Sequence, residues 1–260
     1  MKKYKKKPMF SIITTVLNGE KSIAKTIKSI NNQNFKNYEY IIVDGGSNDQ
    51  TLNILKKNKN KISKIISSKD KGIYDGFNKG MRIAKGSYIC FVNSDDEFFR
   101  DSLKIVSKYL IKNPSFDFLF GTVKKHYGIL HGFNKNKINW SWNFYTSHST
   151  GFFIKSTSAK KIGEYNLKYK FCADYDYFYR MVVKHKMSGG ATKKTELIGK
   201  FAPGGFSTKI NRFDLFIEEI LIRINNKQNI IYILMFVFNK LLNNPVVLLK
   251  SLLKKTNFLN

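Results

Sequence analysis

Apolar runs rich in β-branched residues alternate with segments of helical spacing through the first 92 residues of the chain. The runs have the length of β-strands and cover residues 10–17, 38–43, 62–67 and 87–92. The segments between them have helical spacing and cover residues 23–30, 51–57 and 73–84. Strands that alternate with helices form a mostly parallel sheet through right-handed crossovers, so the pattern predicts an α/β fold.

Polar or glycine-rich residues directly follow three of the predicted strands. Asn18 follows the first strand, the sequence DGGSNDQ follows the second, and NSDD (residues 93–96) follows the fourth. Ligands bind at the carboxyl edge of a parallel sheet. We therefore expect these three segments to converge on one edge and to form a site there.

The rest of the chain divides into a continuation of this domain and a tail. Residues 101–112 and 171–186 have helical patterns, residues 116–121 resemble a strand, and residues 126–148 are aromatic and irregular. From Phe213 onward, long apolar stretches alternate with Lys and Asn. With 260 residues and 42% hydrophobic content, the chain suits one α/β domain. We expect that domain over residues 1–212 and a basic, apolar helical tail over residues 213–260.

The charge of the chain favours polyanionic partners. It has 46 basic and 18 acidic residues, and the formal net charge of +28 would attract nucleic acid, an anionic membrane or phosphorylated small molecules. Few arginines are present for bidentate contacts to phosphate or guanine: Arg82, Arg100, Arg180, Arg212 and Arg223. We therefore expect no nucleic acid partner. A compositional bias toward Lys, with most lysines solvated, explains at least half of the charge.

Cysteine usage and the N-terminus indicate a cytoplasmic protein. Cys90 and Cys172 lie far apart in or beside apolar runs, which is typical of buried thiols in a reducing compartment. The basic start and short apolar stretch imitate a signal peptide, but TTVLNGE offers no small-residue cleavage site.

The acids of NSDD have two interpretations. Paired carboxylates at a strand end can hold a divalent cation, since magnesium and manganese prefer oxygen ligands and leave positions open for phosphate. Alternatively, Ser94 or Asp96 caps the next helix by accepting hydrogen bonds from its free amide groups. For an isolated SDD sequence, capping is the commoner case.

The SDD sequence is not isolated. FSIITTVLN, IIVDGGSNDQT, DKGIYDGFNKGMRIAKGSYICFVNSDD and ADYDYFYRM occur in this order, and together they resemble the motifs of family 2 glycosyltransferases, particularly bacterial enzymes that build surface polysaccharides. The resemblance covers about the first 210 residues. It implies a GT-A fold, which is a single nucleotide-binding α/β domain with a mixed, mostly parallel sheet flanked by helices.

The resemblance implies roles for the ends of the first two strands. Thr14, Thr15 and Asn18 lie in the segment that resembles the nucleotide-binding end of the first strand. Asp44 resembles the aspartate that accepts a hydrogen bond from the uracil ring, and a buried carboxylate would reject a base without that N–H group. A tight turn with an Asx cap is the alternative explanation for Asp44 and Gly45.

The sequence DKGIYDGFNKG resembles the part of the family that lines the nucleotide-sugar pocket. Lys71, Gly72, Asp75 and Asn78 match positions of that lining. Lys71 could neutralise diphosphate charge. For Asp75, pocket lining and simple helix capping remain equally open.

NSDD corresponds to the metal-binding D-x-D region of the family, but Asn93 stands where the first aspartate usually is. An amide oxygen could contact ribose or a metal-bound water, although its electrostatic attraction to a cation is weaker. We expect Asp95 to bind Mn²⁺ or Mg²⁺ directly and Asp96 to face the sugar.

The remaining site residues come from the second half of the domain. Asp174 aligns with the catalytic base of the family, and Asp176 would then pair with Arg180 at i,i+4. Periodicity alone favours a structural cap for Asp174. His148 in SHSTGFF resembles a motif near donor phosphates or acceptor, and the APGGFS sequence (residues 202–207) resembles a flexible loop that closes over the diphosphate, although a simple turn explains it almost as well.

The implied reaction transfers a sugar from a nucleotide diphosphate donor, UDP by preference, to an acceptor hydroxyl of a lipid-linked glycan, with inversion. Residues 230–238 are too short to span a bilayer, and flanking lysines favour interfacial attachment to the inner face of the cytoplasmic membrane. Packing on the domain or a dimer contact is the alternative, so oligomeric state stays open. A nucleotidyltransferase and a basic nucleic-acid-binding protein are the rival functions.

Overall fold

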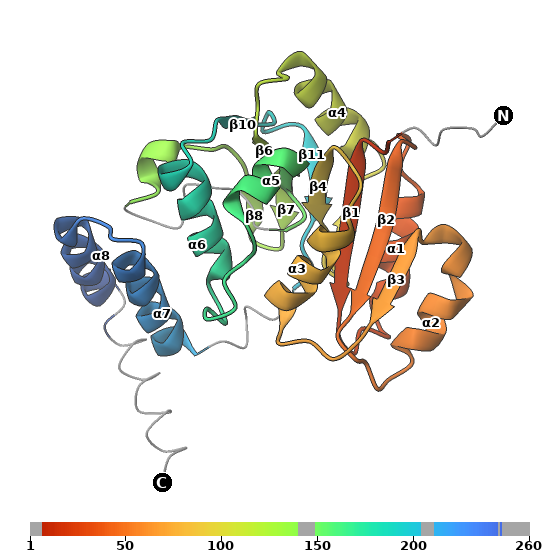
Figure 1. Cartoon of the computed structure of the whole chain (residues 1–260), viewed down its shortest axis with the longest axis horizontal. Helices are drawn as coiled ribbons and strands as arrows, with labels where there is room; N and C mark the ends of the chain where they lie inside the picture. Colours follow the sequence, from red (N-terminus) through yellow and green to blue (C-terminus); the bar gives the residue numbers. More distant parts are fainter. Residues whose placement is uncertain (1–6, 140–148, 204–210, 244, 246–260) are drawn as a thin grey trace, which may run out of the picture.

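The computed structural model describes residues 7–139, 149–203, 211–243 and 245 (Figure 1). The strands are β1 (Phe10–Val16), β2 (Tyr38–Asp44), β3 (Lys64–Ser67), β4 (Tyr88–Phe91), β5 (Glu97–Phe98), β6 (Phe118–Phe120), β7 (Thr122–Lys125), β8 (Gly128–Leu130), β9 (Phe152–Lys155), β10 (Gly189–Ala191) and β11 (Leu197–Lys200). The α-helices are α1 (Ile23–Asn31), α2 (Thr51–Lys57), α3 (Ile73–Ile83), α4 (Ser102–Lys112), α5 (Ser156–Ile162), α6 (Ala173–Tyr179), α7 (Arg212–Asn225) and α8 (Ile230–Asn243).

The main sheet is mixed and mostly parallel, as the sequence predicts. It has seven strands in the order β10-β6-β9-β4-β1-β2-β3, and β9 runs antiparallel to both of its neighbours. The pairs β1–β2, β1–β4, β2–β3 and β6–β10 are parallel. A smaller sheet of order β5-β11-β7-β8 lies beside it. Because β4 belongs to the first sheet and β5 to the second, the NSDD segment joins the two sheets.

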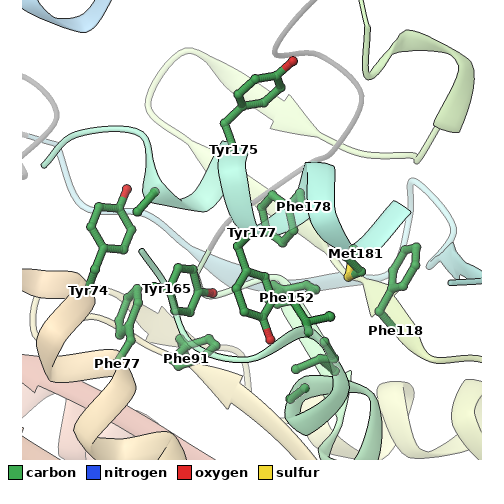
Figure 2. Packing of buried hydrophobic residues seen from close by; sticks show 14 of the residues in the cluster. Tyr74, Phe77, Phe91, Phe118, Phe152, Tyr165, Tyr175, Tyr177, Phe178 and Met181 are labelled. Atoms are coloured by element: carbon green, nitrogen blue, oxygen red, sulfur yellow. The ribbon is translucent and has the colours of Figure 1, made fainter. Parts of the chain in front are cut away.

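Alternation along the strands gives the main sheet two apolar faces. Ile12 of β1 packs in one buried cluster with side chains of α1 and α4. Ile13, the next residue, belongs to the opposite cluster together with Phe77 of α3 and Tyr177 of α6. Figure 2 shows this second cluster, in which the Tyr165 ring stacks on Tyr74 of α3 and on Tyr177 of α6. Helices therefore cover both faces of the sheet, and α3 and α6 share one of them.

The predicted strands and helices of the first 112 residues are confirmed to within two residues at their ends. The predicted helix over residues 171–186 is shorter: α6 ends at Tyr179 and a π-helical turn continues over Arg180–Lys184. In that turn the amide of His185 donates to the carbonyl of Arg180 at 2.9 Å, and the Arg180 side chain donates to the carbonyls of Ile162 and Glu164. Residues 126–148, for which the sequence predicts no regular secondary structure, contain the short strand β8.

The tail packs on the domain through α7. Ile222 of α7 is fully buried and belongs to the same cluster as α3 and α6. Phe216 of α7 and Phe236 of α8 pack against each other with ring centroids 6.1 Å apart, and Figure 1 shows the two helices side by side next to α6. Of the described helices, none combines the length and apolar character that a bilayer span requires. The first helix of the tail is thus part of the core.

Candidate functional site

The ends of β1 and β2 form one edge of the site. The Gly45 amide donates to the Val16 carbonyl at 2.9 Å, which joins the two strand ends. Asn18 adopts a left-handed conformation with a φ of 52°, and its amide donates to Ser47 Oγ at 2.8 Å. The Asn18 side chain accepts a hydrogen bond from the Asn48 amide at 2.9 Å. The expected convergence of these loops is confirmed, and Asn18 is exposed at this edge.

Asp44 lies at the end of β2 with no exposed surface. Its carboxylate accepts hydrogen bonds from the amides of Gly46 and Ser47, both at 3.2 Å, and from Ser67 Oγ at 2.7 Å. These are the turn contacts that the alternative interpretation requires. They also hold the carboxylate at the sheet edge where the predicted uracil contact would lie. A uracil base that binds Asp44 would have to compete with the Ser67 hydroxyl for the carboxylate or displace it.

Thr14 and Thr15 point to opposite faces of β1. Thr14 has no exposed surface and accepts a hydrogen bond from the Tyr40 hydroxyl at 3.2 Å. Thr15 lies against α3, where a Cβ added to Gly76 would come within 2.7 Å of its methyl group. Thr14 thus sits beneath the site with a buried partner, whereas Thr15 packs on the helix that follows the predicted sugar-binding loop.

The start of α3 presents Lys71 and Gly72 to solvent, and Gly72 has a φ of 112° that disfavours other residues. The Asp75 carboxylate accepts a hydrogen bond from the Lys71 amide at 3.1 Å and lies 3.5 Å from the Lys79 ammonium. Asp70 accepts from the Gly72 amide at 3.0 Å. These contacts of Asp75 lie at the start of α3 itself and agree with helix capping, one of its two interpretations.

Asn78 makes contacts that differ from the expected ones. It is completely buried, and its side-chain amide donates to the Tyr165 carbonyl at 2.9 Å. Its oxygen accepts from the Tyr165 amide, also at 2.9 Å. This pair of bonds ties α3 to the loop after α5. The contacts favour a structural role for Asn78 over the predicted lining of the sugar pocket, because breaking them would leave buried polar groups without partners.

Asp96 of the NSDD segment connects two other segments of the chain through hydrogen bonds. It is 2% exposed, and its carboxylate accepts hydrogen bonds from Thr150 Oγ1 at 2.8 Å and from the Ala202 amide at 3.1 Å. Burial, and next the charge of Asp95, raise the pKa of Asp96 to about 8. Contrary to the expectation that Asp96 faces the sugar, the described contacts direct its carboxylate toward the segment before β9 and the segment after β11.

Asp95 and Asn93 provide oxygen atoms next to that anchor. Asp95 is half-buried, and burial raises the pKa of its carboxyl group. Asn93 Oδ1 is buried and has no hydrogen-bond partner among the described residues. From the other side, Thr26 of α1 shares its hydroxyl proton between the carbonyls of Ser94 and Asp96, at 2.9 and 2.7 Å. The backbone of the segment is thus fixed while two of its side chains remain available.

This donor set fits a hard divalent cation. The Asp95 carboxyl group, whose pKa is raised by burial, and the Asn93 amide oxygen, which has no partner among the described residues, would both be stabilised by a positive charge. Among the described residues, NSDD included, no group of three or more His, Cys, Asp or Glu side chains with metal-binding geometry is present. A cation at NSDD would therefore need ligands from water or from a diphosphate, as Mg²⁺ commonly does.

Asp174 lies in the first turn of α6 and is 4% exposed. Its Oδ1 accepts hydrogen bonds from the Tyr74 hydroxyl at 3.1 Å and from the Tyr175 amide at 2.9 Å. Cys172 occupies the N-cap position, so the structure does not place Asp174 there. Figure 2 shows Tyr74 rising from α3 with its hydroxyl directed to the start of α6. The predicted base is therefore held by the helix of the predicted donor motif.

Asp176 points away from Asp174, as the helical spacing predicts. It forms the expected ion pair with Arg180 at 2.9 Å, and it also accepts a hydrogen bond at 2.8 Å from Asn226, the C-cap residue of α7. His148, Gly204, Gly205 and Ser207 lie outside the described residues. Cys90 and Cys172 are buried free thiols, as expected.

Three residues of the site region were not identified from the sequence. Tyr74 contacts Asp174, Thr150 holds Asp96, and Glu218 of α7 accepts hydrogen bonds from the backbone just before α6. Tyr74 lies inside the quoted DKGIYDGFNKG motif, which is the only signal for it. No pattern connects Thr150 or Glu218 to their partners, because those contacts join segments 54 and 46 residues apart.

Comparison with known proteins decides the family. The model of "Glycosyl transferase family 2" matches residues 11–177, which include every strand end described above and Asp174. The chain belongs to glycosyl transferase family 2. A "PGL/p-HBAD biosynthesis glycosyltransferase" of Mycobacterium bovis is 31% identical over 180 residues, which are 66% of this chain and 69% of that protein. An uncharacterized glycosyltransferase of Methanocaldococcus jannaschii is 30% identical over 190 residues, 68% of this chain and 65% of that protein.

Solved structures agree on the fold of this glycosyltransferase. S. aureus TarS superposes with a TM-score of 0.67 and 20% identity over 83% of this chain, which spans 39% of the TarS chain. A mannosyltransferase of Pyrobaculum calidifontis, solved with GDP-Man and Mn²⁺, has a TM-score of 0.65 and 14% identity over 94% of this chain and 73% of its own. The predicted GT-A fold with C-terminal helices is confirmed.

Proposed function

We propose that this glycosyltransferase transfers a sugar from a UDP-sugar to an acceptor hydroxyl with inversion at the anomeric carbon, and that Asp174 is its base. The observation that carries the proposal is the hydrogen bond between Tyr74 and Asp174. Tyr74 belongs to α3, whose first residues follow the DKG sequence of the predicted donor loop. The carboxylate is therefore hydrogen-bonded to the helix that begins at the predicted donor loop.

In the proposed reaction, Asp174 accepts the proton of the acceptor hydroxyl while the acceptor oxygen forms a bond with the anomeric carbon. The bond between that carbon and the diphosphate breaks, and its electron pair leaves with UDP. Asn93 and Asp95 would hold Mg²⁺ or Mn²⁺, which when bound supplies positive charge to the departing diphosphate. Lys71, exposed before α3, would add to that charge.

The comparison structures support a nucleotide-sugar donor. TarS was solved with UDP and with UDP-GlcNAc, and the mannosyltransferase with GDP-Man and Mn²⁺. We choose UDP because Asp44, which resembles the family's uracil-binding aspartate, is the last residue of β2. The rival nucleotidyltransferase and nucleic-acid-binding functions are disfavoured by membership of a family of glycosyltransferases.

Calorimetric titration with UDP, in the presence and absence of Mn²⁺, tests the donor site. We expect Mn²⁺ to strengthen UDP binding to the wild type and to lose that effect in Asp95→Ala. Asp101→Ala, at an exposed carboxylate just before α4, is the matched control and should bind as the wild type does. Tighter binding of GDP than of UDP would overturn the choice of base, and the absence of any nucleotide binding would overturn the donor site.

We also propose that α7 and α8 attach the enzyme to an anionic lipid surface, where a lipid-linked glycan acceptor would be found. Large apolar side chains of these helices are exposed: Ile217, Leu221, Ile224, Ile230, Ile231, Leu234, Met235, Phe238, Leu241 and Leu242. No acidic residue occurs after Glu219, whereas Lys227, Lys240, Lys250, Lys254 and Lys255 do. Exposed apolar side chains next to lysines, with no acidic residue after Glu219, are complementary to an anionic membrane, such as the inner face of the cytoplasmic membrane.

Vesicle binding tests this attachment. Wild-type protein should cosediment with anionic vesicles at low salt more than with neutral ones, and Leu234→Glu with Phe238→Glu should abolish the binding. Ile111→Glu is the control, because Ile111 is 70% exposed on α4. Wild-type protein that does not bind vesicles would refute the membrane proposal. Wild-type protein that instead forms dimers, which the same two substitutions dissociate, would refute it in favour of a protein contact.

A further inference from the structure

Glu218 of α7 accepts three hydrogen bonds from successive backbone amides. Its Oε2 accepts from the Lys170 amide at 3.0 Å, and its Oε1 accepts from the amides of Phe171 and Cys172, both at 2.8 Å. These amides belong to the segment that leads into α6, two residues before Asp174. A side chain from a distant helix therefore fixes the backbone that carries the proposed base.

The sequence around α6 cannot provide this contact locally. The N-cap residue is Cys172, and its side chain makes no capping hydrogen bond. The three amides that Glu218 binds precede Ala173, the first residue of α6, so they have no partner within the helix and an acceptor from elsewhere satisfies them. A carboxylate is the strongest choice, because hydrogen bonds to a charged acceptor are shorter and stronger than neutral ones.

The segment held by Glu218 is connected to Asp174 through Tyr74. The Tyr74 hydroxyl lies 3.0 Å from the Phe171 carbonyl and 3.1 Å from Asp174 Oδ1. Since a hydroxyl has a single proton, Tyr74 shares it between these two acceptors. A displacement of residues 170–172 would move one acceptor and change how Tyr74 orients the other.

We propose that Glu218 is a positioning residue for Asp174, acting through the Phe171 carbonyl and the Tyr74 hydroxyl. The inference rests on the proposed function, in which Asp174 is the base. It makes α7, which lies beyond the residues matched by the family model, a working part of the active site. A second bond supports this view, since Asn226 at the end of α7 holds Asp176 on the far side of α6 at 2.8 Å.

Single substitutions at Glu218 measure the size of the effect. Glu218→Ala removes all three acceptor contacts and should lower kcat about tenfold or more, because misplacement of a catalytic group by about 1 Å can cost a factor of about 100. Glu218→Gln retains one oxygen for Phe171 and Cys172 and should recover part of the loss. The KM for the donor should stay unchanged in both, because α7 does not contribute to the strand-end loops.

The matched control is Glu164→Gln, which breaks an exposed ion pair with Arg82 and should leave kcat unchanged. Thermal melts of every variant give the folded fraction. A loss of kcat in Glu218→Ala that only follows a loss of folded protein, or a rise in donor KM without a fall in kcat, would overturn the inference.

A double-mutant cycle with Tyr74→Phe separates positioning from a general structural effect. If Glu218 acts through Tyr74, the double variant should lose no more kcat than Tyr74→Phe alone, because the connection is already broken. Additive losses would show that Glu218 acts by another route and would refute the proposal. Asp174→Asn is assayed in parallel: full activity there refutes the proposed base itself, whereas an inactive Asp174→Asn with a fully active Glu218→Ala refutes only the role of Glu218.

Discussion

Glu219, the neighbour of Glu218 on α7, offers a quantitative test of how the C-terminal helices are bound to the domain. Its side chain has no exposed surface and lies 3.2 Å from the Lys240 ammonium of α8. Burial is the main cause that raises the pKa of Glu219 from 4.5 to about 7, and Lys240 and Arg223 oppose it. Glu219→Gln keeps the shape of the side chain and removes the titrating group.

The sign of the effect follows from the raised pKa. Between pH 4.5 and about 7, the folded protein retains a proton on Glu219 that the unfolded chain has lost. The contribution of Glu219 to the free energy of unfolding is therefore fully present below pH 4.5 and is lost as the pH rises to about 7. Because a tenfold change in proton affinity is worth about 1.4 kcal/mol, the whole change amounts to about 3 kcal/mol. About 2 kcal/mol of it should fall between pH 5 and pH 8.

Urea denaturation of wild type and Glu219→Gln at pH 5 and pH 8 measures this difference. The variant should gain about 2 kcal/mol relative to the wild type at the higher pH. Glu164→Gln is the control, because it makes the same chemical change at a carboxylate that is 46% exposed. If the difference for Glu219→Gln were the same at both pH values, Glu219 would not be buried between α7 and α8 as the structure shows.

Three further predictions concern the site. Asp174→Asn should lower turnover by a factor of roughly 100 to 10,000, because a general base contributes about that factor to the rate. The affinity for UDP should stay nearly unchanged. Turnover rates measure the first effect and calorimetric titration with UDP the second. Asn78→Ala should reduce the free energy of unfolding by about 1–3 kcal/mol in a denaturant titration, because both buried polar groups of Tyr165 lose their partner. Gly45→Ala should weaken UDP binding and lower the melting temperature, because the new Cβ would lie 2.5 Å from Asp70 Oδ2; normal binding and melting would show that Asp70 moves away freely.

Much of the fold could be predicted because the strands and helices follow from the pattern of neighbouring residues in the sequence. The alternation of β-branched runs with helical spacing determines β1 to β4 and α1 to α3, since each side chain must face either the sheet or a covering helix. The same pattern places Asn18, Asp44 and the NSDD segment at one edge, because parallel strands end on the same side. The i,i+4 spacing of Asp176 and Arg180 likewise sufficed to predict their ion pair.

Predictions of individual roles were less complete, because a motif names a residue without naming its partners. Asn78 and Asp96 both stand in the predicted sugar-binding motifs, yet their polar atoms contact Tyr165, Thr150 and Ala202. Each of those partners comes from a segment at least 54 residues away. Nothing in the local pattern distinguishes a buried amide that joins two segments from one that faces a ligand.

The sequence by itself determined the type and order of β1 to β4 and α1 to α4, the edge where the site lies and the family motifs that identify it. Only the tertiary structure decided which side chains complete that site, and it made α7 a part of the core. Backbone periodicity is written into consecutive residues, whereas a contact such as that of Glu218 with the segment before α6 exists only once both have been packed against the same aromatic cluster. The position of Asp174 therefore depends on residues that no motif contains.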